Sequence, residues 1–415
     1  MHELRSAICL VIDRLSAAYV GALGNTWIHT PAFDRLAAES IVFDRAMIDS
    51  PAIAEVYHSY WTGEPAWQNA ARDWTSASTM AQVCRNRSLP TVLVTDDEDI
   101  ATQPLSKAFS EIVRLAPSAE LQQATDWQDT QLARFFAAAV ECLTDHRAPA
   151  LVWLHTAALG RIWDSPQNLR DQYAAEDDPR AFALVEPPSQ KLGTDIDPDE
   201  LLRLRHAYAG EVTVLDNCLS TLLDAIAGSP WSDALLIVTS CRGYPLGEHG
   251  IVGRAADELY AELLQVPLFV RVPGGASFGA RSQYLAQPAD LGATLRDWFA
   301  ATEEAAQAEP RAWFRGRTLL RYDEDAKQTR KLAIARSANG EMALATPSWF
   351  LRAQAQDAET AARTLQLYVK PDDRFEANEV SDRCLQTAEE FRQAVQALES
   401  SLAQGIVPII TLADQ

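Results

Sequence analysis

The stretch Ala7-Ile8-Cys9-Leu10-Val11-Ile12-Asp13-Arg14-Leu15 opens the chain with a continuous apolar run that ends in a charged pair. A run of this length without polar residues is typical of a strand buried on both faces, as in a parallel sheet covered by helices. Ligands of open α/β sheets bind outside the carboxyl ends of the strands, so Asp13 and Arg14 are placed where a ligand would bind. The alternative is that Asp13 only caps the turn that follows.

Other segments of the chain extend this pattern. Apolar runs at residues 150–155 and 234–240 are interpreted as further buried strands, and apolar residues at helical spacing over 122–144 and 200–227 predict helices packed on them. The order favours an α/β fold, a mostly parallel sheet flanked by helices on both faces. Residues 164–198, rich in Pro, Asp, Gln and Arg, are predicted to form a long surface loop over the ligand crevice.

The composition narrows the classes of partner. With 415 residues, 47% apolar and 22% charged, the chain is expected to be a soluble globular protein with one large domain and a smaller appendage, or with two domains. Its formal net charge of −21 argues against a nucleic-acid partner, which would need a basic face. No stretch approaches the roughly 18 apolar residues of a membrane span. We therefore expect neither nucleic acid nor membrane as a partner.

The N-terminal residues and the cysteines indicate a reducing compartment. Residues 1–6 lead into the first apolar run without the basic region, longer apolar core and cleavage site of a secretory signal. We expect a cytoplasmic protein, although a signal trimmed beforehand would leave the same start. The six cysteines are scattered without Cys-x-x-Cys spacing, which favours buried free thiols over disulfides or a zinc site.

Five motifs occur in a recognisable order along the chain. They are VGALGN at 20–25, TPAFDRLA at 30–37, FDRA at 43–46, LGEHG at 246–250 and LYAELLQVPLFVRVPG at 259–274. Together they resemble the sulfatase family of the alkaline-phosphatase-like superfamily. The resemblance implies an alkaline-phosphatase-like α/β main domain over residues 1–314, followed by a linker and a small C-terminal antiparallel α+β subdomain over residues 315–415.

The resemblance also implies a chemistry, but its nucleophile is replaced. Members of the family hydrolyse sulfate esters with a Cys oxidised to formylglycine and with a calcium or magnesium ion held by four oxygen-donor side chains. Counting back from Thr62-Gly63, Ile53 stands at the nucleophile position and Tyr57 at the position of a family Arg. Ile53 has no group to oxidise or ionise. We therefore expect no catalytic residue of the family mechanism.

The metal positions are replaced as well. Asp13 keeps the first of them, whereas Arg14, Cys241 and Arg242 occupy the other three. A hard divalent cation needs several oxygen ligands, and two guanidinium groups beside a single carboxylate would repel it. We expect no bound calcium or magnesium and no other cofactor. Instead, a charge-assisted hydrogen bond from one or both guanidinium groups to Asp13 is expected to fill the site.

Further family positions are kept only in part. His155 stands at the first of two active-site His positions, and Gly160 stands at the second. The family's anchoring Lys is replaced by an acidic run at 95–99, which is interpreted as a solvated face. His249, in the LGEHG motif, and Arg254, where the family has another basic residue, remain candidates for a residual pocket with His155. Packing alone is the alternative role for both histidines.

Two classes of function remain open. The first is a pseudoenzyme that binds a ligand or partner through the old crevice or the predicted loop, with a sulfated or phosphorylated small molecule or sugar as the expected ligand. The second is a hydrolase of sulfate or phosphate esters that uses a rearranged site around Asp13, His155, His249 and Arg254. Because nucleophile, metal ligands, Lys and second His are all changed together, the sequence favours a retained fold without the parent reaction.

Overall fold

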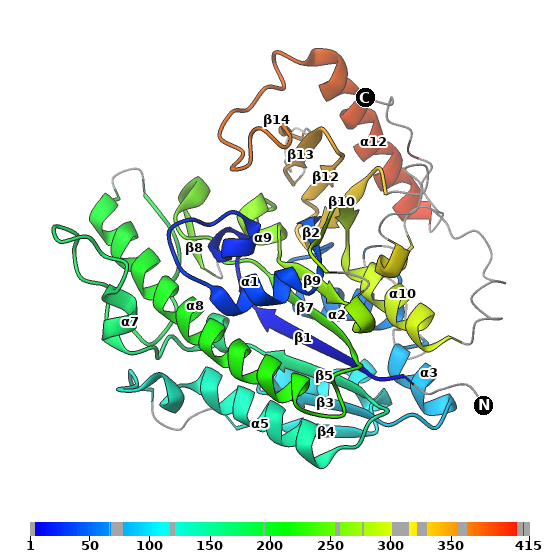
Figure 1. The fold of residues 1–415 in the computed structure, drawn as a ribbon. Helices are drawn as coiled ribbons and strands as arrows, with labels where there is room; N and C mark the ends of the chain where they lie inside the picture. Colours follow the sequence, from blue (N-terminus) through cyan, green and yellow to red (C-terminus); the bar gives the residue numbers. More distant parts are fainter. Residues whose placement is uncertain are drawn as a thin grey trace.

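The computed structural model describes residues 5–65, 67, 78–116, 121–193, 196–253, 258–275, 278–300, 315–321, 330–355, 363–404 and 410. Its centre is an eight-stranded sheet (Figure 1). In spatial order the strands are β10 (Ala280–Ala286), β2 (Ile41–Ala46), β9 (Leu268–Arg271), β7 (Leu235–Arg242), β1 (Ala7–Asp13), β5 (Leu151–Thr156), β3 (Thr91–Thr95) and β4 (Glu111–Arg114). Strand β9 is antiparallel to both neighbours, and the other neighbouring pairs are parallel. The predicted mostly parallel sheet is confirmed.

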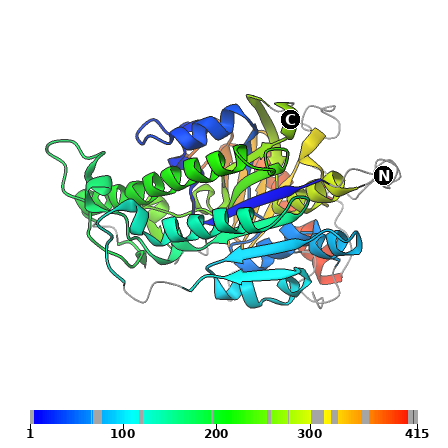
Figure 2. The same ribbon diagram turned by 60° about the horizontal axis from the view of Figure 1, so that its bottom comes forward.

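Strand β1 lies inside the sheet and is buried on both faces. Ile8, Leu10 and Ile12 pack in one apolar cluster with helices α1 (Pro31–Ala38), α5 (Gln131–Asp145) and α8 (Pro198–Ala227). Cys9 and Val11 pack in a second cluster with α2 (Ile53–Thr62), α3 (Met80–Asn86) and α10 (Pro288–Phe299). Figure 2 shows α5 and α8 side by side along one face of the sheet. Both faces of β1 therefore require apolar side chains, which explains the unbroken run.

Helix α5 begins later than the predicted range. The predicted helix covered residues 122–144, but α5 starts at Gln131. The hydroxyl of Thr130 accepts a hydrogen bond from the Ala133 amide and caps the helix, and a 3-10 turn at Trp127–Asp129 precedes it. A side chain that satisfies a free amide at this point fixes the start of the helix after the mostly polar residues 122–129.

The residues predicted as a surface loop, 164–198, are folded around a buried arginine. Arg170, in the short helix α7 (Gln167–Asp171), is fully buried. Its guanidinium donates to Glu211 Oε1 on α8 (3.1 Å), to Ser165 Oγ (3.0 Å) and to carbonyl groups of the segment itself. The described part of the segment is largely irregular and mostly half-buried or exposed, as predicted for a surface loop, but these bonds anchor it to α8.

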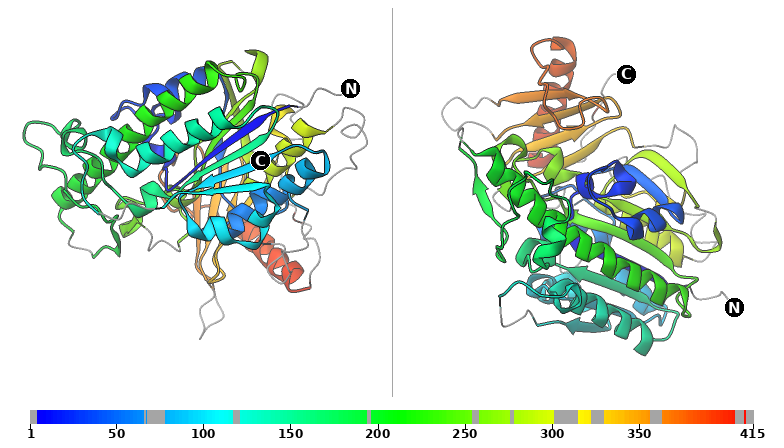
Figure 3. Two further views of the ribbon diagram at one scale, coloured as in Figure 1. Left: turned by 90° about the horizontal axis from the view of Figure 1, so that it is seen from below. Right: turned by 60° about the vertical axis from the view of Figure 1, so that its left-hand side comes forward.

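The C-terminal residues form a second sheet. The antiparallel strands β11 (Ala333–Arg336), β12 (Met342–Ala345), β13 (Trp349–Ala353) and β14 (Leu365–Val369) pair in chain order. One face packs on α12 (Leu385–Gln404), and the other joins the apolar cluster of α2 and α10. Figure 3 shows this sheet and α12 projecting from the main domain. The predicted boundary at 314 borders residues outside the described part, so it stays a prediction.

The remaining short elements connect these layers. They are helices α4 (Glu98–Thr102), α6 (Ala158–Arg161) and α9 (Ala261–Leu264), and the paired strands β6 (Ser189–Lys191) and β8 (Ile251–Gly253). All six cysteines are free thiols, and five of them are buried. Among the described helices, none has both the length and the apolar character needed to cross a bilayer.

Candidate functional site

The carboxyl ends of β1, β5 and β7 bring several predicted site residues together. Asp13 ends β1, His155 lies near the end of β5, and Cys241 and Arg242 end β7. Strands β1 and β7 pair in regular register up to Ile12, but the next pair joins Asp13 to Arg242 and passes over Cys241. This β-bulge inserts one extra residue into β7. As a result, both Cys241 and Arg242 reach the carboxylate of Asp13.

Arg242 binds Asp13 through two parallel hydrogen bonds. Its Nε lies 2.9 Å from Oδ1, and its Nη2 lies 2.7 Å from Oδ2. The thiol of Cys241 donates to Oδ1 across 3.2 Å. Burial alone would raise the pKa of Asp13, but the charge and hydrogen bonds of Arg242 outweigh burial and lower the pKa below its usual value. The carboxylate is therefore held in its charged form, and the structure contains the expected bond from Arg242.

Arg14 fills the space on the other side of Asp13. Its backbone is left-handed (φ 67°), and its buried guanidinium donates from Nη1 to the Gly243 carbonyl over 3.3 Å. Burial, together with the charge of Arg242, lowers the pKa of Arg14 to about 10. Gly160 on α6 faces this group so closely that an added Cβ would lie 2.9 Å from Arg14 Cγ and 3.1 Å from Asp13 Oδ2. A histidine at position 160 would therefore collide with Arg14.

His155 is held by Tyr57, the residue at the position of the family Arg. The Tyr57 hydroxyl lies 2.5 Å from His155 Nδ1, and neither side chain is exposed to solvent. Burial raises the pKa of Tyr57 well above its usual value. A neutral, enclosed phenol of this kind is a poor nucleophile, so the pair acts as a structural contact. Ile53 begins α2 and contributes no polar group to the site.

The acidic run after β3 contributes two carboxylates that the sequence interpretation placed in solvent. Asp96 is buried and accepts from the Thr156 hydroxyl and the Ala157 amide, each across 2.8 Å. Asp97 Oδ2 lies 3.7 Å from His155 Nε2. The prediction of a solvated face is therefore wrong for these two residues. The signal for them was their position at the end of a strand next to β5, where polar side chains meet at one sheet edge.

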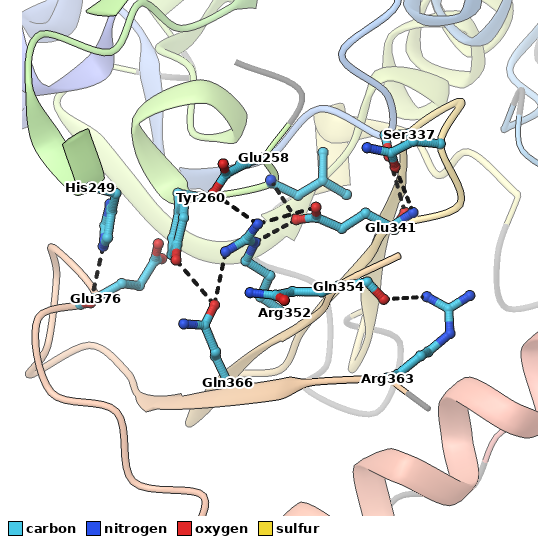
Figure 4. A network of polar contacts seen from close by, with 12 residues as sticks. His249, Glu258, Tyr260, Ser337, Glu341, Arg352, Gln354, Arg363, Gln366 and Glu376 are labelled. Carbon is cyan, nitrogen blue, oxygen red and sulfur yellow. Dashed lines mark hydrogen bonds and ion pairs between the residues drawn. The ribbon is translucent and has the colours of Figure 1, made fainter. Parts of the chain in front are cut away.

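His249 belongs to a different group of side chains, at the seam with the C-terminal sheet (Figure 4). Its ring stacks on Tyr260 with centroids 3.6 Å apart, its Nδ1 lies 2.8 Å from Glu262 Oε1, and its Nε2 lies 3.1 Å from the Glu376 carbonyl. The Arg352 guanidinium, from β13, also packs on the Tyr260 ring. Burial lowers the pKa of His249, but Glu262 raises it more. His249 thus joins the two parts of the chain.

The residues at the old metal positions do not fit a divalent cation. Both oxygens of Asp13 already accept from Arg242, and the neighbouring positions carry Arg14 and the Cys241 thiol. Within the described residues, no group of three or more His, Cys, Asp or Glu side chains is arranged to hold a metal ion. Ile53 does not fit formylglycine, which needs an oxidisable side chain. Arg254, the last predicted site residue, lies outside the described residues.

Comparisons with known proteins agree with the motifs. A family model described as Sulfatase matches residues 5–301. The multifunctional alkaline phosphatase superfamily protein PehA of Trinickia caryophylli is 27% identical over an alignment of 146 residues, and the match covers 32% of this chain and only 27% of that protein. The structure of BT4656 in complex with its substrate D-glucosamine-2-N,6-O-disulfate superposes with a TM-score of 0.75 at 16% identity, covering 97% of this chain and 98% of the other. Phosphonate monoester hydrolase of Agrobacterium radiobacter gives 0.74 at 16% identity, covering 97% and 96%.

Proposed function

Because the chain belongs to the sulfatase family, we propose that it is a member that keeps the fold but does not hydrolyse esters by the family mechanism, and that it acts by binding a ligand or partner. The observation that carries the proposal is the paired hydrogen bond from Arg242 to Asp13. In this family the same carboxylate would bind the metal ion. A guanidinium that uses both carboxylate oxygens supplies the positive charge without the coordination chemistry of a cation.

Other contacts support the same proposal. Ile53 offers no nucleophile, and Tyr57 is bound to His155 and fully buried. Asp13, Arg14, Cys241 and Arg242 together form the Asp13 group. Two of its members are almost completely buried, since Asp13 and Arg14 are each only 3% exposed. An ester phosphorus or sulfur must approach a nucleophile and a charged site at the same time. Among the described residues around Asp13, we find no reactive nucleophile and no charged site that an ester could approach.

The proposed ligand is a small molecule. BT4656 is described in complex with a sulfated sugar, and the Agrobacterium protein is a hydrolase of phosphonate monoesters. By analogy we propose a sulfated or phosphorylated small molecule or sugar for this chain. The edge of Arg242 that faces away from Asp13 is directed at the Pro51 carbonyl, with Nη1 3.3 Å from that oxygen. This contact favours a site in which Arg242 donates only to groups of the protein over a site in which Arg242 binds an anionic ligand.

The test is an assay for turnover with metals added and removed. Purified protein is incubated with nitrophenyl sulfate, nitrophenyl phosphate and nitrophenyl phenylphosphonate, each with calcium, magnesium or manganese and each with EDTA. A sulfatase with an intact formylglycine site is the positive control. We expect no turnover above buffer, and metal analysis of the purified protein should find calcium and magnesium far below one ion per chain.

The competing candidate is a hydrolase with a rearranged site around Asp13, His155, His249 and Arg254. It is retained because the similar proteins include an alkaline phosphatase superfamily protein and a phosphonate monoester hydrolase. It predicts turnover that Asp13→Asn abolishes. Asp224→Asn is the matched control, because Asp224 is an exposed carboxylate whose ion pair among the described residues is with Arg35. Turnover lost in Asp13→Asn but kept in Asp224→Asn would overturn the proposal.

A further inference from the structure

A cavity of about 250 Å³ lies at the seam between the main sheet and the C-terminal sheet. Its walls come from β2, β10 and α9 on one side, and from β12, β13 and the turn at residues 370–376 on the other. No residue of the Asp13 group lines it. Strands β9 and β7 separate β2 from β1, which corresponds to roughly 14 Å between β2 and β1 at about 4.8 Å per strand. The cavity is therefore distinct from the old catalytic crevice.

The inner wall of the cavity is apolar. Met47, Leu264, Leu285, Ala345 and Phe350 line it, and all five are buried. By volume the cavity corresponds to about eight water molecules, at about 30 Å³ each. Water in contact with such a wall would find few hydrogen-bond partners. An apolar body of a few carbon atoms or a single aromatic ring would gain contacts with the same wall.

Most polar groups at the rim already have partners. Asp44 accepts from Arg281 and Gln283, and Arg45 donates to the carbonyls of residues 346 and 347. Lys370 pairs with Glu376 Oε1 at 3.0 Å and also donates to two carbonyls of its own turn. The charges of Asp44, Lys370 and Glu376 are thus paired within the protein, whereas Arg45 has carbonyl acceptors, and its bonds join the main sheet to the C-terminal sheet.

Arg374 is the exception among the charged lining residues. Its guanidinium has no hydrogen bond or ion pair to any described residue, and its ring contact is with the neighbouring Phe375, 5.7 Å from the centroid. Nη1 extends to the turn at Gly24, whose added Cβ would lie 3.0 Å from it. Only a glycine at that left-handed turn (φ 100°) leaves the guanidinium this close to the backbone.

The sign of the charge at the cavity is opposite to that of the whole chain. Three cations (Arg45, Lys370, Arg374) and two carboxylates (Asp44, Glu376) line it, which gives 3 − 2 = +1, whereas the chain carries −21. Arg45 already donates to two carbonyl groups, so Arg374 is the lining guanidinium with donors left for a ligand, and it matches one negative charge. The acidic net charge of the chain disfavours a more highly charged ligand. An arginine binds the planar end of a carboxylate, or two oxygens of a sulfate ester, through parallel N–H donors.

We propose that this cavity binds a small organic monoanion, with its carboxylate or sulfate-ester group on Arg374 and its apolar body against Phe350 and Leu285. The site does not depend on whether the Asp13 group is catalytic. It also gives the C-terminal sheet a role beyond packing, because both the charged group and part of the apolar wall come from it.

Three probes of similar size test the proposal: phenylacetate, its neutral amide phenylacetamide, and phenyl sulfate. Ligand-observed NMR titration of the full chain gives a Kd for each. We expect saturable binding of at least one of the two anions, with phenylacetamide about tenfold weaker or more, the size expected for loss of a charge-assisted hydrogen bond. Tighter binding of phenyl sulfate would assign the ligand to sulfate esters, and tighter binding of phenylacetate would assign it to carboxylates; both support the site.

Two variants and one control locate the binding. Arg374→Gln keeps the length of the side chain and should remove the preference for the anion, whereas Ala345→Leu fills the apolar wall and should weaken anion and amide alike. Arg383→Gln is the matched control, since Arg383 is exposed and has no side-chain partner among the described residues. Melting curves check that each variant is folded. Equal binding of anion and amide, unchanged anion affinity in Arg374→Gln, or no saturable binding of either anion would overturn the proposal.

Discussion

Replacing Arg242 by Met should destabilise the protein strongly, because it leaves Asp13 charged and unpaired inside the fold. Arg242 and Asp13 side chains are 17% and 5% exposed, so solvent screens the pair only weakly. Met keeps the approximate length of the side chain but cannot donate a hydrogen bond. Asp13→Asn is the complementary single substitution, and it leaves the guanidinium without a charged partner.

The magnitude follows from the geometry of the pair. With Nη2 and Oδ2 2.7 Å apart, the charge centres lie about 4 Å apart, and at an effective dielectric constant of about 20 their attraction is about 4 kcal/mol. Removing one partner of a buried pair costs about 3–5 kcal/mol, which agrees with this value. Replacing both partners should cost less than the sum of the two single substitutions, although the buried Arg14 loses the neighbouring Asp13 charge in each variant that carries Asp13→Asn. We therefore expect a coupling energy of at least about 2 kcal/mol between Asp13→Asn and Arg242→Met.

Urea unfolding followed by tryptophan fluorescence measures the four members of the cycle. The pKa of Asp13 is depressed in the folded state, so the pair adds stability above the unfolded value of about 4, and this stability is lost as the pH falls through the lower folded value. The difference between wild type and Arg242→Met should be full at pH 7 and should narrow below about pH 4. Added calcium should not raise the midpoint of either single variant.

Two results would refute this reasoning. Single substitutions that each cost less than about 1 kcal/mol and that add in the double variant would show that the pair behaves like an exposed ion pair. A calcium-dependent rise in the midpoint of Arg242→Met would show that Asp13 can still recruit a cation once the guanidinium is gone. That outcome would also weaken the proposed loss of the metal site.

Three further substitutions test other parts of the fold. Tyr57→Phe removes the partner of the buried His155 Nδ1 and should cost about 1–3 kcal/mol in the same urea series; a cost near zero would contradict the contact. Asp216→Ala removes the acceptor for two α1 amides and should cost about 1–2 kcal/mol, whereas the exposed Asp224→Ala should cost under about 1 kcal/mol. His249 has a raised pKa, so it adds stability below its unfolded value of about 6.5 and loses it as the pH rises through the folded value. Melting curves at pH 6 and pH 8 should differ less in His249→Gln than in wild type.

Much of the fold could be predicted from the sequence, because both faces of the central strands are covered and only apolar residues satisfy them. The run at β1 and the strands β5 and β7 were recognisable for this reason. Helix starts were harder to predict. The predicted range began at residue 122, but residues 122–130 are mostly polar and the Thr130 cap begins α5 after them. The anchoring of the surface loop by Arg170 was also missed, because it depends on one buried guanidinium and on bonds to carbonyl groups that no side-chain pattern encodes.

The sequence predicted which residues form the candidate site better than it predicted how they are arranged. Counting along the family motifs placed Asp13, His155 and Arg242 at strand ends, and the structure brings them to one sheet edge. The β-bulge that brings both Cys241 and Arg242 to the carboxylate has no signal in the sequence. The burial of Asp96 was missed too. An acidic run is normally interpreted as solvent-exposed, and its burial becomes apparent only when the position of β3 beside β5 is considered.

The replacements at the old site compensate one another, which explains how the fold survives the loss of so many polar family residues. A buried polar group without a partner costs about 1–3 kcal/mol, and a buried charge costs more. Here Arg242 neutralises Asp13, Tyr57 bonds His155, and the missing side chain at Gly160 makes room for Arg14. Restoring the second His at position 160 would collide with Arg14, and restoring the Arg at position 57 would remove the partner of His155; neither change would complete the metal site. We therefore expect single reversions to leave the Asp13 site without a bound cation, and a cation site to return only after several simultaneous changes.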